Sequence, residues 1–129
     1  MKRPNLPQLS QQIAALFSTL ASPARVAILL AIGRGEACVC HLEAMLGWRQ
    51  AYISQHLMAL RKADILQDRR DGRFIFYRIK NASFLDLITA ATSLSGLSAE
   101  ATSAPIQMDK KRTCACPRCA TILLPNRSS

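Results

Sequence analysis

The chain has 129 residues, half of them hydrophobic, and a formal net charge of +9 from 17 basic and 8 acidic residues. This length accommodates one domain with tails, and the charge favours a polyanionic partner, nucleic acid before an anionic membrane surface. No apolar run approaches the roughly 18 residues that a membrane span needs, and no uninterrupted apolar stretch follows Lys2 and Arg3. We therefore expect no membrane partner, no secretory signal and a cytoplasmic location.

Two helices are predicted at the start of the folded region. Apolar residues recur at helical spacing from Leu9 to Leu20. Ser22 then supplies an N-cap and Pro23 the first residue of a second helix, which runs to about Ile32 and ends at the glycines of residues 33–35. Residues 1–8 are expected to form an N-terminal tail.

A helix-turn-helix is predicted next. Residues 36–46 contain a short third helix, Gly47-Trp48 forms a turn, and a fourth helix follows over residues 50–63. The inward-facing residues of the third helix are Val39, Leu42 and Leu46. The buried stripe of the fourth helix is Ile53, Leu57 and Leu60. Two short helices joined by a tight glycine turn are typical of a DNA-binding helix-turn-helix, in which the second helix reads the bases.

A β-hairpin follows the fourth helix. Residues 65–68 and 73–79 read as strands, with Ile75, Tyr77 and Ile79 alternating onto one face of the second strand. Asp71-Gly72 between them is a strong hairpin signal, because both residues tolerate positive φ. Basic residues cluster at the hairpin tip, as in the wing of a winged helix: Arg69, Arg70 and Arg73.

A fifth helix, capped by Asn81, completes the predicted fold. Its apolar stripe is wide, so we expect the first and last helices to form a homodimer surface. The fold class is therefore mainly α with a small β-hairpin, a winged helix-turn-helix of order α-α-α-α-β-β-α. The folded domain spans residues 9–95, and residues 96–129 form a flexible linker and a cysteine-containing tail.

All five cysteines fall in two clusters: Cys38 and Cys40, and in the tail Cys114, Cys116 and Cys119. Their odd number argues against a closed set of disulfides, and thiols in a reducing cytoplasm serve more often as metal ligands or reactive groups. Residues two apart diverge by about 200° on a regular helix. Cys38 and Cys40 can therefore share an ion only if the third helix is extended or unwound at its start, and binding would distort that helix.

The ordered set of motifs resembles the ArsR/SmtB family of small metal-sensing winged-helix repressors. The match is carried by residues 20–25 (LASPAR), 38–42 (CVCHL), 54–57 (SQHL) and 69–73 (RRDGR), and covers roughly residues 10–95. The resemblance implies a dimer that binds a two-fold operator and is released by an ion on cysteine thiolates. Glu43 stands where the arsenic-responsive branch often has a third cysteine, and Asp64 where the family usually has glycine.

The family's reading positions fall on the fourth helix: Gln50, Ser54, Gln55 and His56. Gln55 can pair bidentately with adenine, whereas a packing role for His56 is an equal alternative. Four arginines are expected to contact phosphates: Arg61, Arg69, Arg70 and Arg73. Trp48 and Tyr52 are expected to be structural, packing the turn.

Soft thiolates select Cd(II), Zn(II) and Cu(I), while As(III) and Sb(III) take three thiolates and Pb(II) often does. We rank As(III) or Sb(III) ahead of Cd(II) or Pb(II) as inducer, with Zn(II) as a further candidate. The tail cysteines can join Cys38 and Cys40, from the same or the partner subunit, or form a separate structural zinc site. The alternative without a binding role is that Cys38 and Cys40 are two small hydrophobic residues of the core, since free cysteine is often buried.

Two rival functions stay open. A repressor of the same fold could sense thiol oxidation or sulfide through its paired cysteines. A small thiol oxidoreductase could use Cys116-Pro117-Arg118-Cys119, although a C-x-x-C of that kind normally neighbours a βαβ pattern, which the sequence lacks. The chain is not expected to be an enzyme.

Overall fold

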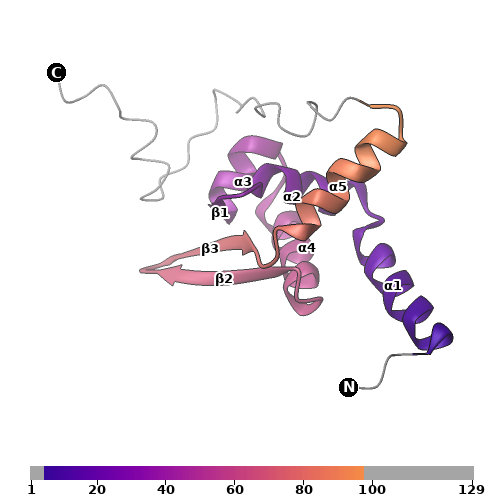
Figure 1. The fold of residues 1–129 in the computed structure, drawn as a ribbon. Helices are drawn as coiled ribbons and strands as arrows, with labels where there is room; N and C mark the ends of the chain where they lie inside the picture. The colour runs from indigo at the N-terminus through magenta and orange to yellow at the C-terminus, as the bar shows by residue number, and fades with distance from the viewer. Residues whose placement is uncertain (1–4, 98–129) are drawn as a thin grey trace.

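The computed structural model describes residues 5–97 of the chain. Within them, helices and a small antiparallel sheet follow one another in the order shown in Figure 1. The elements are α1 (Leu6–Leu20), α2 (Pro23–Ile32), β1 (Glu36–Cys38), α3 (Val39–Leu46), α4 (Gln50–Lys62), β2 (Leu66–Asp71), β3 (Phe74–Ile79) and α5 (Ser83–Leu94). The predicted winged helix-turn-helix is confirmed, with one strand more than expected.

The first helix begins three residues earlier than predicted. Asn5 Oδ1 accepts the backbone N–H of Gln8 at 3.0 Å, and Gln8 Oε1 accepts the N–H of Asn5 at 3.4 Å. This capping box satisfies two N–H groups that a helix start leaves without partners. Residues 6–8, expected in a tail, therefore form the first turn of α1. The N-cap of α2 is confirmed, since Ser22 Oγ accepts from the N–H of Arg25.

The helix-turn-helix forms as its apolar pattern predicts. Gly47 ends α3 in the left-handed conformation, with φ at 73°. The predicted stripe of α4 is fully buried: Ile53, Leu57 and Leu60. Asp64 follows α4 with φ at 64°, so the aspartate adopts the left-handed conformation at the position where the resembled family usually has glycine.

The sheet contains a strand that the sequence did not indicate. β1 pairs with β3, and the strand order is β1-β3-β2, all antiparallel. Residues 36–38 were expected at the start of the third helix. They are extended instead, because they pair with β3, with Cys38 opposite Phe76 and Glu36 opposite Arg78. A strand of three residues carries no period of its own, so only its partner reveals it.

The predicted hairpin is confirmed, but its turn is shifted by one residue. Asp71 pairs with Phe74, which leaves Gly72 and Arg73 as the two turn residues. Arg69 and Arg70 consequently lie in strand β2, and only Arg73 lies at the tip.

The described residues bury two apolar clusters. The main core joins the helices to the inner face of the sheet, and Tyr77 and Ile79 pack against it. On the opposite face of β3, Phe76 and Cys38 are buried together, 1% and 2% exposed. The most buried side chain of β3 is therefore Phe76, which the predicted alternation placed outside, because β1 covers it.

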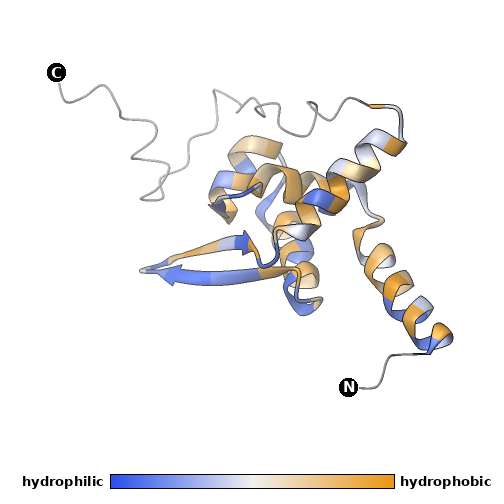
Figure 2. Cartoon of the chain, viewed as in Figure 1, coloured by the Kyte–Doolittle hydropathy of each residue, from blue (hydrophilic) through white to orange (hydrophobic). Residues whose placement is uncertain are grey.

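The outer helices leave much apolar surface uncovered. No residue of α1 is buried, and α5 buries only Ile88. Phe17 is 52% exposed, and Figure 2 shows apolar residues along α1, which projects from the rest of the fold. Among residues 5–97 no single helix is long and apolar enough to cross a bilayer; α1 and α2 reach that measure only as a pair bent by 81°.

Candidate thiol site and DNA-binding face

The two cysteines of the first cluster lie side by side at the start of α3. Cys38 is the N-cap of that helix, with extended backbone, and its Sγ accepts the N–H of His41 at 3.4 Å. The sulfur atoms of Cys38 and Cys40 are 3.0 Å apart, in hydrogen-bonding contact. The predicted extended start of the third helix is thus present, and the sulfurs converge while α3 stays intact.

The thiol pair opens into a groove of about 380 Å³ between the helix-turn-helix and the wing. The two walls come from different elements. Glu43 of α3 and Gln50 and Ser54 of α4 form one side, while Arg73, Phe74, Ile75 and Tyr77 of the hairpin form the other. The groove therefore brings the predicted thiol ligands together with two predicted base-reading residues and one predicted phosphate contact.

Within the described part of the chain, the candidate metal ligands are two cysteine sulfurs, those of Cys38 and Cys40. Among residues 5–97, no three side chains of His, Cys, Asp or Glu are grouped so that they could hold an ion. The predicted tail ligands lie outside the described residues: Cys114, Cys116 and Cys119. The two sulfurs, one at the positive end of a helix dipole, suit a soft cation or metalloid.

The outward face of α4 carries more candidates than predicted. Gln50 and Gln55 are exposed, whereas Ser54 is half-buried beside the thiol groove. Tyr52 and Met58 are also outward, 45% and 57% exposed. Tyr52 was expected to pack the turn, and its ring does meet that of Trp48. It is outward-facing as well, as its spacing from the buried stripe of Ile53, Leu57 and Leu60 indicates.

His56 faces the fold rather than the open side of α4. It is half-buried, and its Nδ1 accepts a hydrogen bond from Arg25 Nε at 3.4 Å. Burial, and secondarily the guanidinium of Arg25, lower the pKa of His56 below its usual value. The geometry favours the packing role over a base contact for this residue.

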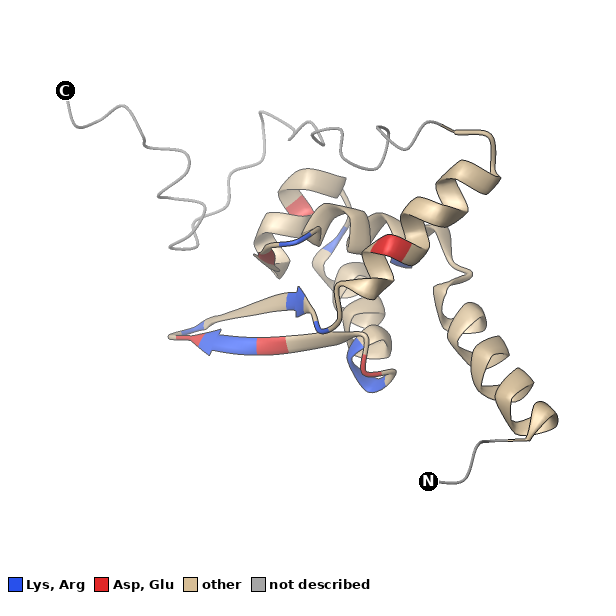
Figure 3. Cartoon of the chain, in the orientation of Figure 1, with Lys and Arg blue, Asp and Glu red and all other residues tan. Residues whose placement is uncertain are grey.

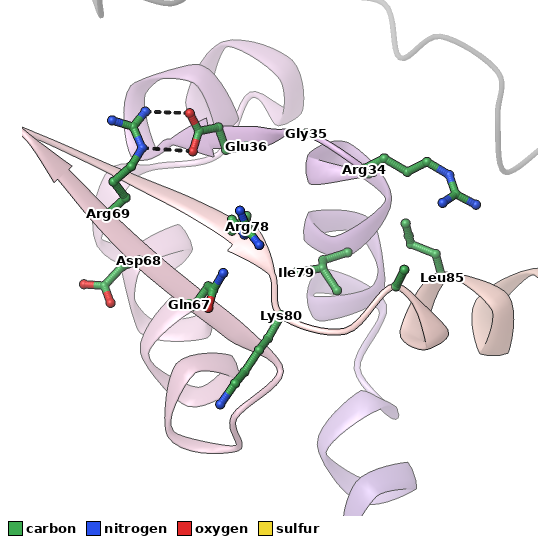
Figure 4. Close-up of a pocket in the computed structure, with 12 residues that line it drawn as sticks. Arg34, Gly35, Glu36, Gln67, Asp68, Arg69, Arg78, Ile79, Lys80 and Leu85 are labelled. Atoms are coloured by element: carbon green, nitrogen blue, oxygen red, sulfur yellow. Dashed lines mark hydrogen bonds and ion pairs between the residues drawn. The ribbon is translucent and has the colours of Figure 1, made fainter.

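The basic residues of the wing differ in the side chains that they contact. Arg69 makes two hydrogen bonds to the carboxylate of Glu36 (Figure 4). Its guanidinium also lies over the ring of Phe76, 4.8 Å from the ring centroid. The hydrogen bonds that Arg69 donates to Glu36 raise the pKa of Arg69 above its usual value. Arg73 stacks on Phe74 at the exposed tip, where basic residues gather (Figure 3).

Arg61 and Asp68 connect the end of α4 to the base of the wing. Arg61 Nε donates to Asp68 Oδ1 at 2.9 Å. Both side chains are exposed to solvent, so the ion pair contributes little to stability. Arg61 can therefore leave Asp68 and bind a DNA phosphate instead. Arg70 is exposed on β2.

An apolar groove of about 420 Å³ runs between α1, α2 and α5. Phe17 and Leu20 line it from α1, Leu30 from α2, and Leu87 and Ala91 from α5. Figure 3 shows α1 without a charged residue, whereas the wing and the end of α4 carry many. The groove and the uncharged helix beside it form one apolar surface.

Comparison with known proteins places these features in a family. Residues 22–68 match the family described as "Bacterial regulatory protein, arsR family". The Biofilm growth-associated repressor of Agrobacterium fabrum is 39% identical over 87 residues, which are 67% of this chain and 74% of that protein. The arsenic resistance transcriptional regulator ArsR1 of Pseudomonas putida is 46% identical over 65 residues, half of this chain and 51% of that protein.

A solved structure agrees with the observed fold. The crystal structure of the transcriptional repressor BigR from Xylella fastidiosa superposes with a TM-score of 0.64 and 32% sequence identity. The superposition covers 73% of this chain and 96% of that one. Almost the whole of that repressor therefore has a counterpart in this chain.

Proposed function

The chain belongs to the ArsR family of bacterial regulators and is a transcriptional repressor of that family, and we propose that a thiophilic metal or metalloid ion bound at Cys38 and Cys40 releases it from its operator. Without the ion, a homodimer binds a two-fold operator and blocks transcription. With the ion bound, operator affinity falls. Coupling of this kind typically amounts to about 1–3 kcal/mol, or about 5- to 150-fold in affinity.

One observation carries this proposal: the thiol pair and DNA-reading residues line the same groove. The sulfurs of Cys38 and Cys40 are 3.0 Å apart. Gln50 and Ser54 of α4 and Arg73 of the wing line the groove into which they open. An ion held there changes charge and shape at the edge where α4 approaches DNA. Coupling then needs no unwinding of α3, because Cys38 already lies outside that helix.

We assign the remaining ligands to the tail cysteines, from the same or the partner subunit: Cys114, Cys116 and Cys119. As(III) and Sb(III), which take three thiolates, rank ahead of Cd(II), Pb(II) and Zn(II). The similarity to an arsenic resistance regulator of Pseudomonas putida supports this order. A tail that instead holds structural zinc would bind that ion without affecting DNA affinity.

In this proposal α4 enters the major groove and the β2–β3 hairpin meets the backbone or minor groove. Gln50, Ser54 and Gln55 are the base-reading candidates. Arg70 and Arg73 are exposed and suited to phosphates. Arg61 and Arg69 are engaged by carboxylates, so they contact phosphate only by exchanging partners. His56 acts through packing.

The homodimer is supported by the uncovered apolar surface of α1 and α5. Phe17, Leu20, Leu87 and Ala91 line the groove between these helices. α1 carries no charged side chain and buries none of its residues within a single copy. A second copy that covers this surface removes it from water, and each square ångström of apolar area removed contributes roughly 25 cal/mol.

The test is a titration of operator binding by fluorescence anisotropy, under strict reduction, with As(III), Sb(III), Cd(II), Pb(II) and Zn(II). The wild type is expected to lose about fivefold or more in affinity with at least one ion. Cys38→Ser and Cys40→Ser keep ion-free affinity and lose the response. Met45→Leu serves as the control, because it removes a thioether sulfur from α3 and leaves both cysteines in place. An unchanged response in Cys38→Ser overturns the thiol assignment.

The tail is tested separately, in the same assay, with all three of its cysteines replaced by serine. Loss of the As(III) response with retained ion-free affinity supports tail ligands. A full response in this variant shows that the tail does not take part in sensing, while the assignment of Cys38 and Cys40 stands.

A second candidate function is favoured by the same sulfur contact: repression relieved by thiol oxidation or by sulfide. The sulfurs of Cys38 and Cys40 are 3.0 Å apart, and an oxidant that joins two reduced thiols as a disulfide removes two electrons and two protons. Metal ions under strict reduction would then leave operator affinity unchanged, while an added oxidant lowers it. The thiol oxidoreductase drops out, because members of this family are DNA-binding regulators and not enzymes.

A further inference from the structure

A line of side chains connects the end of α1 to the DNA-reading face of α4. It begins at Arg25 of α2, whose Nη1 donates to the carbonyl oxygen of Thr19 at 3.0 Å. The Nε of the same guanidinium donates to Nδ1 of His56 at 3.4 Å. Arg25 therefore bridges the last turn of α1 and the middle of α4, and it lies 31 positions of sequence from His56.

The line continues along α4 as an aromatic row. The ring of His56 meets that of Tyr52 edge to face, with centroids 4.7 Å apart. Tyr52 in turn meets Trp48 edge to face at 5.4 Å. Residues 48, 52 and 56 are four apart, so they fall on one side of the helix and its preceding turn. Trp48 packs against the main core, which anchors the row at its far end.

Tyr52 is the exposed member of this row. Trp48 and His56 are half-buried on either side of it, whereas Tyr52 is 45% exposed. Two edge-to-face contacts restrict its ring, and such contacts favour a defined ring orientation. A side chain that is both restricted and exposed on a recognition helix loses little conformational entropy on binding.

The hydrogen bond to Arg25 sets the state of the histidine. Nδ1 can accept a hydrogen bond only when it carries no proton, so His56 is neutral with its proton on Nε2. Arg25 is the charged group that faces His56 from α2, and Tyr52 is its titratable neighbour on α4. A protonated His56 would lose its acceptor and face a like charge.

We propose that Tyr52 contacts operator DNA and that Arg25 and His56 are positioning residues that hold it for this contact. The phenol can stack or hydrogen-bond at a base edge or phosphate, and the neighbouring guanidinium and imidazole need not touch DNA. The proposal rests on the DNA binding of the family and is independent of the ion. It adds a specificity residue to α4 and connects it to α1, the helix assigned to the dimer surface.

The experiment measures operator affinity of the full-length, ion-free, reduced protein. Tyr52→Ala is expected to weaken operator binding by about tenfold, as for loss of one good contact. Arg25→Gln and His56→Leu weaken it by a similar factor. His56→Asn, which keeps an acceptor for Arg25 but removes the ring that meets Tyr52, is expected to lose part of the affinity and less than His56→Leu. Urea unfolding of each variant identifies any loss caused by unfolding instead.

The decisive measurement is a double-mutant cycle. In a Tyr52→Ala background, His56→Leu is expected to have no further effect on affinity, because its role is exerted through Tyr52. Additive losses would overturn the positioning role, and an unchanged affinity of Tyr52→Ala would overturn the contact itself. Neither result bears on the thiol site, since no ion is present, so the two proposals fail independently.

Discussion

Single residues determine where the helices of this chain begin and end. Asn5 and Ser22 provide side-chain oxygens to the first N–H groups of α1 and α2. Cys38 does the same for α3 with sulfur. The backbone of Cys38 is extended because it pairs with β3, and its Sγ lies 3.0 Å from that of Cys40. A capping role and a proposed ligand role thus share one atom, and an ion on Cys38 would compete with the cap.

The conformation of Asp64 predicts a ranking of variants. A φ of 64° is costly for most residues that have a Cβ, because the Cβ approaches a carbonyl oxygen, and is better tolerated by Asp, Asn and Gly. Asp64→Ala is expected to lower the free energy of unfolding by about 1–2 kcal/mol. Asp64→Asn should stay within about 0.5 kcal/mol, because the lost ion pair with Lys80 is exposed. Urea unfolding measures the order, and equal stability of the Ala and Asn variants would contradict it.

His56 predicts a pH dependence of stability. Because burial and then Arg25 lower its pKa in the folded state, the unfolded chain binds more protons as the pH falls. The contribution of this residue is fully present above the unfolded pKa of about 6.5 and is lost as the pH falls toward the folded value. Urea midpoints at about pH 7.5 and about pH 5.5 should differ more in the wild type than in His56→Asn. An equal drop in both would exclude His56 as the cause.

At the scale of elements, the wing is a three-stranded unit rather than a free hairpin. β1 pairs with β3, and the ion pair of Glu36 with Arg69 ties β1 to β2 across it (Figure 4). Cys38 and Phe76 are buried between β1 and β3. The thiol site is therefore built on the wing as well as on α3. In the proposed function, an ion at Cys38 would act on β3, the strand that pairs with Cys38 and begins at the wing tip.

This arrangement predicts that the wing arginines contribute unequally to DNA binding. Arg73→Ala should reduce the slope of log affinity against log salt by about 0.9, the value for one phosphate contact on duplex DNA. Arg69→Ala should change it less, because Glu36 already engages this guanidinium. Arg34→Ala, which removes an exposed charge before β1, serves as the control. Equal slopes for the Arg69 and Arg73 variants would show that Arg69 exchanges Glu36 for phosphate.

At the scale of the whole molecule, charge and apolar surface are separated. Basic residues gather on the wing and the end of α4, whereas α1 carries none (Figure 3). The apolar groove between α1 and α5 lies away from the thiol groove, and the two share no lining residue. One part of the surface suits DNA and an ion, and the other suits a second copy of the chain.

The apolar surface predicts a monomeric variant. Phe17→Glu places a charge where α1 would meet the partner subunit, and an unpaired charge in an apolar interface is strongly unfavourable. Sedimentation should show a dimer for the wild type and a monomer for Phe17→Glu, with operator affinity lost in parallel. Gln12→Glu adds the same charge on an exposed position of the same helix and should leave the dimer intact. A dimeric Phe17→Glu would place the interface elsewhere.

Local patterns were sufficient for the helices and the hairpin. The stripe of α4, the Ser22-Pro23 start of α2 and the turn beside Asp71 depend on neighbours in sequence, so periodicity and capping chemistry predicted them. The spacing of Cys38 and Cys40 showed only that an extended start of the third helix is needed for the two sulfurs to share an ion; the pairing of β1 with β3 provides that extended start. The start of α1 was placed three residues too late, because the apolar pattern was taken to begin at Leu9, after the cap at Asn5.

Tertiary structure decided which face each side chain takes and which partner it finds. β1 exists only because β3 pairs with it, and this pairing buries Phe76 and brings Glu36 to Arg69. Arg25 reaches His56 across 31 positions of sequence. Such contacts join residues that no local period relates, because their energy is realised only when distant segments are packed together. The sequence alone thus determined the winged helix and its thiol pair, and the packed chain determined what lies beside that pair.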